Sequence, residues 1–137
     1  MKNLKTIEEF IAKHHLLTLA TLYKNIPQCC SLFYCYNPKN NTFIVASDTK
    51  TNHIQNTLLD PHVGCSIALE TSEIGKIEGV QIEGVLQPLN EKKERLLYFK
   101  KFPYALALQP TLWQIVPSRF KYTSNRLGFG KKLIVEF

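Results

Sequence analysis

The chain has 137 residues, of which 45% are hydrophobic and 20% charged, and this length and composition are typical of one globular domain spanning 1–137. It has no internal repeat and no apolar run long enough to cross a membrane, and acidic residues interrupt the segment where a signal peptide needs apolar side chains, which predicts a cytoplasmic protein. The net charge of +6 comes from residues 91–137, and this asymmetry suits nucleic acid, an anionic small molecule or ordinary solvated surface.

The first third of the sequence predicts one helix and three strands. Thr6 and Glu9 have the spacing of a capping box, so we expect a short amphipathic helix that ends near His14. After it, β-branched and aromatic residues alternate with turn-forming residues, as in an antiparallel meander. The expected strands are Leu16–Tyr23, Cys29–Tyr36 and Thr42–Ala46.

The segment from Ser47 to His53 joins the third strand to a helix expected at Lys50–Leu59, which ends before Asp60 and Pro61. A hydroxyl-rich, cationic turn at a helix N-terminus offers free N–H groups, a positive dipole end and side-chain donors, which together favour a phosphate-binding site. The same residue types also serve as ordinary N-caps without any ligand. The residues alone leave both interpretations open.

The remaining sequence predicts further strands and one more helix. Val80–Leu86 alternates between apolar and polar residues, and Glu91–Phe102 has the pattern of a basic amphipathic helix that stops before Pro103. The order of elements predicts a mainly β, α+β fold: a small antiparallel barrel of six to seven strands with peripheral helices. The other expected strands are Val63–Leu69, Leu112–Val116, Phe120–Thr123 and Lys132–Phe137, with a turn at Pro117 and Ser118 between the second and third of these.

The four cysteines form no C-x-x-C pair, and we expect buried free thiols. The histidines show no zinc-ligand spacing, so no metal site is predicted. The cysteines are Cys29, Cys30, Cys35 and Cys65, and the histidines are His14, His15, His53 and His62.

Several segments carry a resemblance that covers nearly the whole chain. They are the turn Lys50–His53 followed by Asp60 and Pro61, the strand Gly79–Gly84 and the strand Trp113–Pro117. In this order they resemble the pyridoxamine-phosphate oxidase-like, FMN-binding split-barrel superfamily. More narrowly, Ser31–Tyr34, Arg119–Asn125 and Leu127–Lys132 resemble a small, functionally uncharacterised bacterial branch of it, and Leu127–Lys132 is the most specific of these segments.

The resemblance implies a homodimer of split barrels, with FMN bound at two sites on the interface. It assigns the phosphate to Ser47, Lys50, Thr51 and His53, and the flavin ring to the surroundings of Ser31, the backbone at Ala46, Gln81 and Trp113. Trp113 is equally well explained as a core aromatic residue. At His53 the superfamily commonly has Lys or Arg, and a neutral imidazole supplies one donor and no fixed charge.

The function implied by the resemblance is an FMN-dependent oxidoreductase of unknown substrate and reductant, with no catalytic residue assigned. Arg119 and Arg126 are candidates for contact with an anionic substrate. The alternative is a non-catalytic split-barrel binding module whose slot is empty or holds haem, a deazaflavin or another flat ligand; for haem, His14, His15 or His62 would have to serve as axial ligand. Nucleic acid ranks third, because a basic helix face is more often solvated surface.

Overall fold

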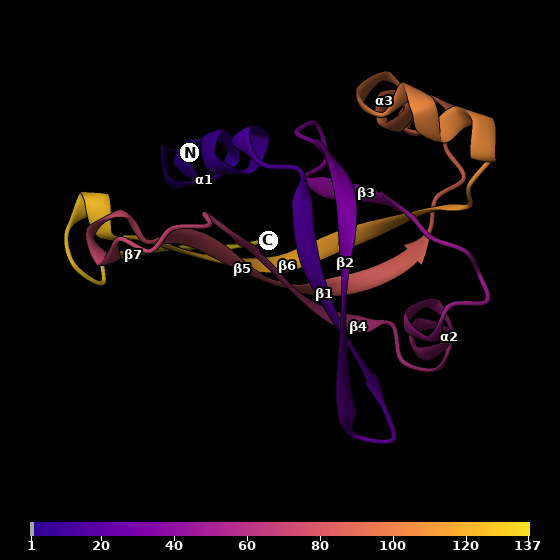
Figure 1. The fold of residues 1–137 in the computed structure, drawn as a ribbon, viewed down its shortest axis with the longest axis horizontal. Helices are drawn as coiled ribbons and strands as arrows, with labels where there is room; N and C mark the ends of the chain where they lie inside the picture. Colours follow the sequence, from indigo (N-terminus) through magenta and orange to yellow (C-terminus); the bar gives the residue numbers. More distant parts are fainter. Residues whose placement is uncertain (1) are drawn as a thin grey trace.

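The computed structural model describes residues 2–137, and in this part of the chain seven strands and three α-helices form the fold (Figure 1). Three short 3₁₀ segments, η1 (Ile74–Lys76), η2 (Pro103–Leu108) and η3 (Asn125–Leu127), lie in the connections. The helices are α1 (Lys2–Lys13), α2 (Asn52–Leu59) and α3 (Lys92–Lys101), and the strands are β1 (Leu16–Tyr23), β2 (Ile26–Asn37), β3 (Thr42–Ala46), β4 (His62–Ala68), β5 (Glu78–Pro88), β6 (Leu112–Ser124) and β7 (Lys132–Glu136).

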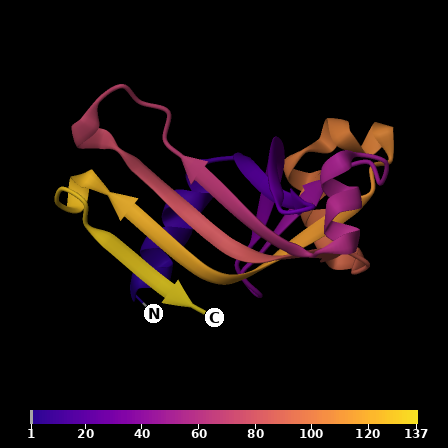
Figure 2. The same cartoon turned by 90° about the horizontal axis from the view of Figure 1, so that it is seen from below.

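Six strands close into an antiparallel barrel in the order β3-β2-β1-β4-β5-β6, because β6 also pairs with β3. The seventh strand, β7, pairs with the C-terminal half of β6 and extends the sheet beyond the barrel. Figure 2 shows β4, β5, β6 and β7 side by side as one curved sheet. This arrangement confirms the expected antiparallel split barrel of six to seven strands with peripheral helices.

The turn predicted at Pro117 and Ser118 is wrong, because β6 continues through it as one strand. Proline is tolerated here because one edge of β6 changes partner at this point: pairing with β3 ends at Ile115 and pairing with β7 begins at Arg119. On the other edge, the register with β5 shifts next to Gly84. A Cβ on this glycine would lie 2.5 Å from the carbonyl oxygen of Val116, so only glycine permits this close approach.

The barrel interior holds a hydrophobic core built from inward-facing strand residues such as Leu19, Phe43 and Phe120, all inaccessible to solvent. Helix α1 adds Ile7 and Phe10 to this core. The predicted capping box is wrong: α1 already begins at Lys2, and the Thr6 hydroxyl donates to the Lys2 carbonyl, 3.2 Å away, within the helix. The position of this helix is therefore explained by the helical spacing of its apolar residues and not by that cap.

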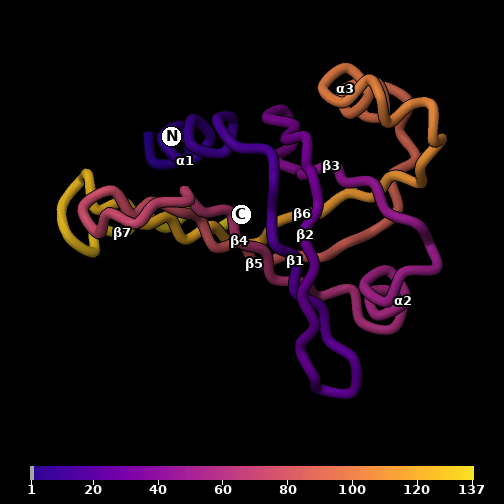
Figure 3. The backbone as a smooth tube through the Cα atoms, viewed as in Figure 1, coloured from indigo at the N-terminus to yellow at the C-terminus, as the bar shows by residue number. Residues whose placement is uncertain are grey.

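The helices occupy separate places around the barrel (Figure 3). Helix α3 covers the outer face of β3, where Tyr98 packs with Ile44 and Leu112 in a second apolar cluster. Helix α2 packs against the β1–β2 hairpin, which projects beyond the barrel and turns at Lys24 and Asn25 (Figure 1). None of the helices in residues 2–137 is long and apolar enough to span a membrane.

The thiols are free, as expected, but not all are buried. Cys35 and Cys65 are buried, whereas Cys30 is half-buried and Cys29 is exposed on β2, because the two neighbours point to opposite faces of that strand. Within the described part of the chain no group of three histidine, cysteine or acidic side chains could hold a metal ion.

Candidate functional site

The turn between β3 and α2 is held by hydrogen bonds to residues at the start of β6, which are distant from it in the sequence. The Ser47 N–H donates to the carbonyl oxygen of Thr111 at 3.0 Å, and the Trp113 indole N–H donates to the carbonyl oxygen of Ser47 at 3.0 Å. Trp113 is only 5% exposed and lies in the barrel core. It therefore acts on this turn by fixing the backbone of Ser47, not by offering an open ring face.

Ser47, Thr51 and His53 form a compact polar cluster, which we call the hydroxyl–imidazole cluster. The Nε2 of His53 lies 2.5 Å from the Ser47 hydroxyl oxygen and 3.2 Å from that of Thr51. With Nε2 protonated, the imidazole donates to Ser47 and leaves the hydroxyl proton of Ser47 free for a ligand. Burial lowers the pKa of His53 from its ordinary value of 6.5, so the ring is neutral at pH 7.

The cluster lies at the N-terminus of α2, whose first turn has free N–H groups. Thr51 is the N-cap residue but makes no side-chain cap, because its hydroxyl donates to the carbonyl oxygen of Asp48 at 2.8 Å. The Asp48 carboxylate is occupied by the Lys50 N–H at 2.8 Å. The N–H groups of Asn52 and His53 find no acceptor in the described part of the chain. The Lys50 side chain is exposed beside them.

The structure thus brings together the side chains of three residues that the resemblance assigns to phosphate, Ser47, Thr51 and His53, and the fourth, Lys50, precedes Thr51 in the chain with an exposed side chain. They provide the Ser47 hydroxyl, an imidazole, the ammonium group of Lys50 and free backbone donors at the positive end of a helix dipole, whereas the one proton of the Thr51 hydroxyl is used on the Asp48 carbonyl. Such a set suits a small multivalent anion.

The residues assigned to a flavin ring are spread over more of the molecule. Ser31 is exposed on the outer face of β2, and extending the β2–β3 register past Tyr34 and Val45 brings it alongside the turn that follows Ala46. Ala46 is half-buried and pairs with Leu112. These two residues therefore lie close to the hydroxyl–imidazole cluster.

Gln81 lies on the same outer face but far from Ser31. Thr18 pairs with both Ser31 and Ser66, and Ser66 pairs with Gln81, so the four exposed residues form one row across β2, β1, β4 and β5. Three strand spacings amount to about 14 Å. One protomer therefore does not bring Gln81 to a ring that lies against Ser31.

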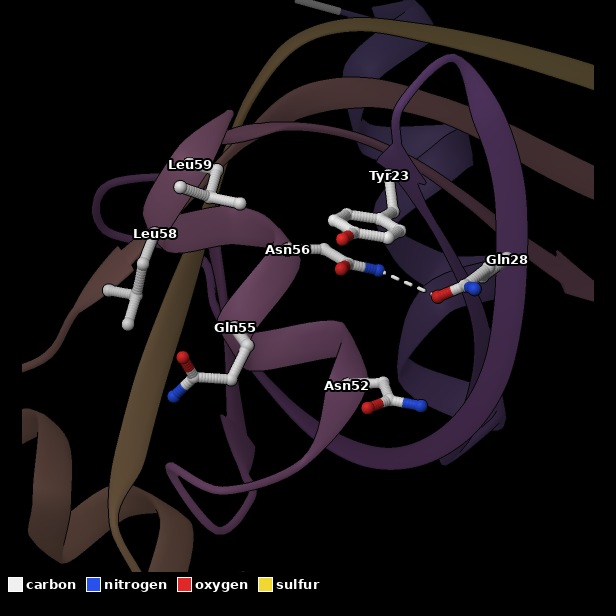
Figure 4. A pocket seen from close by; sticks show the side chains of 7 residues that line it. All are labelled: Tyr23, Gln28, Asn52, Gln55, Asn56, Leu58 and Leu59. Carbon is white, nitrogen blue, oxygen red and sulfur yellow. Dashed lines mark hydrogen bonds between the residues drawn. The ribbon is translucent and has the colours of Figure 1, made fainter.

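A cavity of about 420 Å³ between α2 and the β1–β2 hairpin was not predicted from the sequence (Figure 4). Asn56 is buried in it and donates from Nδ2 to the Thr21 hydroxyl at 3.1 Å and to Oε1 of Gln28 at 2.8 Å. The available signal was weak: Thr21 is a polar residue on the inward-facing side of β1, and Asn56 lies among other polar residues of α2.

The two candidate arginines lie elsewhere. Arg119 on β6 is 3.2 Å from the Glu83 carboxylate and 3.7 Å from that of Glu136, so its guanidinium already faces two anionic groups. Arg126 is exposed on η3. Neither contacts the hydroxyl–imidazole cluster.

The sequence is similar to bacterial proteins along its whole length. It is 36% identical over 136 residues to the UPF0306 protein Ent638_3591 of Enterobacter sp. strain 638, covering 97% of this chain and 96% of the relative. It is 30% identical over 137 residues to the UPF0306 protein YhbP of Escherichia coli O157:H7, covering 98% and 93% of the two chains. A scan against protein-family models finds no match.

Solved structures share the fold at low sequence identity. A haem-binding protein of Mycobacterium smegmatis has a TM-score of 0.76 at 16% identity, over 92% of this chain and 54% of its own. An FAD-binding protein of Mesorhizobium loti has a TM-score of 0.69 at 14% identity, over 85% and 88%. A putative pyridoxamine 5'-phosphate oxidase of Listeria innocua has a TM-score of 0.68 at 12% identity, over 86% and 95%. With its full-length relatives, the chain belongs to the UPF0306 family, which includes YhbP, and it has the split-barrel fold of pyridoxamine-phosphate oxidase-like proteins.

Proposed function

We propose that this protein is an FMN-binding flavoprotein whose phosphate site is the hydroxyl–imidazole cluster at the start of α2. The proposal rests on the convergence of Ser47, Thr51 and His53 on one point, next to backbone N–H groups that no side chain caps, with the exposed Lys50 adjacent to Thr51 in the chain. A phosphate monoester has three acceptor oxygens and nearly two negative charges, and it matches these donors.

The site offers little fixed positive charge to a bound phosphate. The exposed Lys50, adjacent to Thr51 in the chain, supplies the fixed positive charge, since burial lowers the pKa of His53 and favours its neutral form. A phosphate dianion bound against Nε2 favours the imidazolium form, because opposite charges at short distance stabilise each other. We therefore expect FMN binding to protonate His53, so that the imidazole takes the place of the lysine or arginine that the superfamily commonly has.

The isoalloxazine ring, in this proposal, lies against the outer face beside Ser31 and Ala46 and is covered by a second copy of the chain. The outer row of Thr18, Ser31 and Ser66 has small side chains, which allow close approach of a partner, and exposed Leu16 and Phe33 flank it. Gln81 would then reach the ring from the partner, which accounts for its distance from Ser31 within one protomer.

The bound flavin supplies the redox chemistry. The residues of this chain hold the phosphate, orient the ring against the outer face of β2 and exclude water through the partner. We infer an oxidoreductase activity on this basis, with the substrate entering from the remaining open side of the ring.

A non-catalytic module for a flat ligand is the second candidate, favoured by the low fixed charge of the phosphate site. Haem would need an axial ligand, and none of the three candidates, His14, His15 and His62, belongs to the hydroxyl–imidazole cluster or lines the cavity beside α2. His14 packs on the Phe10 ring at a centroid distance of 4.4 Å, and Nδ1 of His62 lies 2.8 Å from the Asp60 carboxylate. Flavin therefore fits the described residues better than haem does.

An absorption spectrum of the purified protein, recorded after incubation with excess FMN and desalting, tests the proposal. Flavin bands at about one FMN per chain would support it. A protein that leaves the column without flavin would contradict it, and a Soret band acquired on incubation with haemin would favour the second candidate.

A further inference from the structure

The cavity between α2 and the β1–β2 hairpin has the chemistry of a binding site. At about 420 Å³ it falls within the ~300–1,000 Å³ typical of ligand pockets. Its lining combines amide side chains with Tyr23, Leu58 and Leu59 and contains no charged residue (Figure 4). A ligand group that fits here is uncharged and rich in hydrogen-bonding atoms.

The amides that line the cavity keep donors and acceptors to spare. The Nδ2 of Asn56 donates to the Oε1 of Gln28. The Oδ1 of Asn56 and the Nε2 of Gln28 are left for a ligand. The Asn52 side chain is exposed and makes no hydrogen bond to the described residues. Adjacent donors and acceptors of this kind match the edge of a nitrogen heterocycle.

Tyr23 adds a flat surface. Tyr23 is 40% exposed, and the Nζ of Lys24 lies 5.2 Å from its ring centroid. The side chain extends from the end of β1 on the same side of the hairpin as Thr21, opposite to the outer row of Thr18 and Ser31. Leu58 and Leu59, which are 57% and 76% exposed, supply apolar surface from α2. An aromatic face beside apolar and amide groups is how proteins hold a planar base.

The cavity adjoins the phosphate site through the first turn of α2. Asn52 lines the cavity, and its neighbours in the chain, Thr51 and His53, belong to the hydroxyl–imidazole cluster. We propose that the cavity binds the base of a purine nucleotide whose phosphate lies at the N-terminus of α2. This inference rests on the proposed function for the phosphate site. The nucleotide is either the adenylate half of FAD or a free purine nucleotide, since both present the same base and phosphate.

Isothermal titration calorimetry with FMN, FAD and AMP tests this inference on the wild type, on Tyr23→Ala and on a matched Tyr104→Ala control. Tyr104 is 94% exposed and does not line the cavity. We expect FAD to bind about tenfold more tightly than FMN, AMP to compete with FAD, and Tyr23→Ala to remove the advantage of FAD while leaving FMN binding unchanged. Asn52→Ala should weaken FAD and AMP in the same direction.

The outcomes separate this inference from the proposed function. Equal affinities for FMN and FAD, with no binding of AMP, would overturn the nucleotide site and leave the flavoprotein proposal intact. Binding of AMP that depends on Tyr23, without binding of FMN or FAD, would support the site with a free nucleotide as ligand and refute the flavoprotein proposal. FAD and AMP affinities that Tyr23→Ala and Asn52→Ala both leave unchanged would overturn the site whatever the flavin result.

Discussion

The double substitution Lys50→Ala/Thr51→Val tests the phosphate site most directly. Valine keeps the shape of Thr51, and helix α2 loses no cap, because the Thr51 side chain makes no cap hydrogen bond. We expect the Thr51 hydroxyl to turn from the Asp48 carbonyl to the phosphate when FMN binds. A hydrogen bond to a charged group contributes ~1.5–3 kcal/mol, and an exposed ammonium such as that of Lys50 contributes ~0.2–1 kcal/mol. The combined loss of about 2–4 kcal/mol should weaken FMN binding by about 30- to 700-fold.

Quenching of flavin fluorescence on titration with protein measures this affinity, and riboflavin, which has no phosphate, serves as the comparison ligand. Its affinity should change little in the variant. Thr71→Val/Lys76→Ala makes the same chemical change in the loop around η1, where Thr71 accepts a hydrogen bond from the Glu73 N–H and Lys76 pairs with Glu73. FMN binding within twofold of the wild type by the Lys50/Thr51 variant, or a fall in riboflavin binding as large as that in FMN binding, would rule out a phosphate contact at these two residues.

Three further outcomes are expected. Ser66→Arg, which puts a long charged side chain into the outer row, should convert a dimer into a monomer by light scattering; a wild type that is already monomeric would contradict the dimer proposal. Burial holds the pKa of His53 below 6.5, so stability due to its neutral form should be lost as pH falls from 6.5 through that lowered value. FMN binding should be accompanied by uptake of protons, which calorimetry in buffers of different ionisation enthalpy measures. Binding without proton uptake would argue against protonation of His53 by the phosphate. Gly84→Ala should lower the free energy of unfolding in urea by about 1–3 kcal/mol, because its Cβ would meet the Val116 carbonyl at 2.5 Å; Gly75→Ala, with nothing within 4 Å, is the control, and equal effects would argue against the clash.

The sequence was sufficient for the strands because their signals are local. Alternation along Val80–Leu86 and the turn residues between strands give the type and order of elements, and the barrel follows from that order. Pro117 misled the prediction, because whether a proline breaks a strand depends on which partner lies at each edge, and this is settled by pairing between residues far apart in the chain.

The same distinction between local and long-range contacts applies to the candidate site. Ser47, Thr51 and His53 are close in sequence; the turn alone left a phosphate site and an ordinary N-cap open, and the assignment of these residues to phosphate came from the resemblance. The cavity beside α2 needs Tyr23 and Gln28 from a distant hairpin, so no sequence window contains it. The separation of Gln81 from Ser31 likewise depends on strand order, since β1 and β4 lie between their strands.

The anchoring of Ser47 has a consequence for synthesis on the ribosome. The turn after β3 is held by Thr111 and by Trp113, and the latter hydrogen bond joins residues 66 positions apart. Closure of the barrel likewise waits for β6 to pair with β3. Contacts of such large sequence separation form only after the intervening chain is available. The nascent chain therefore carries the residues of the phosphate site before it can organise them, and ligand capture waits until Thr111, Trp113 and the part of β6 that pairs with β3 are available.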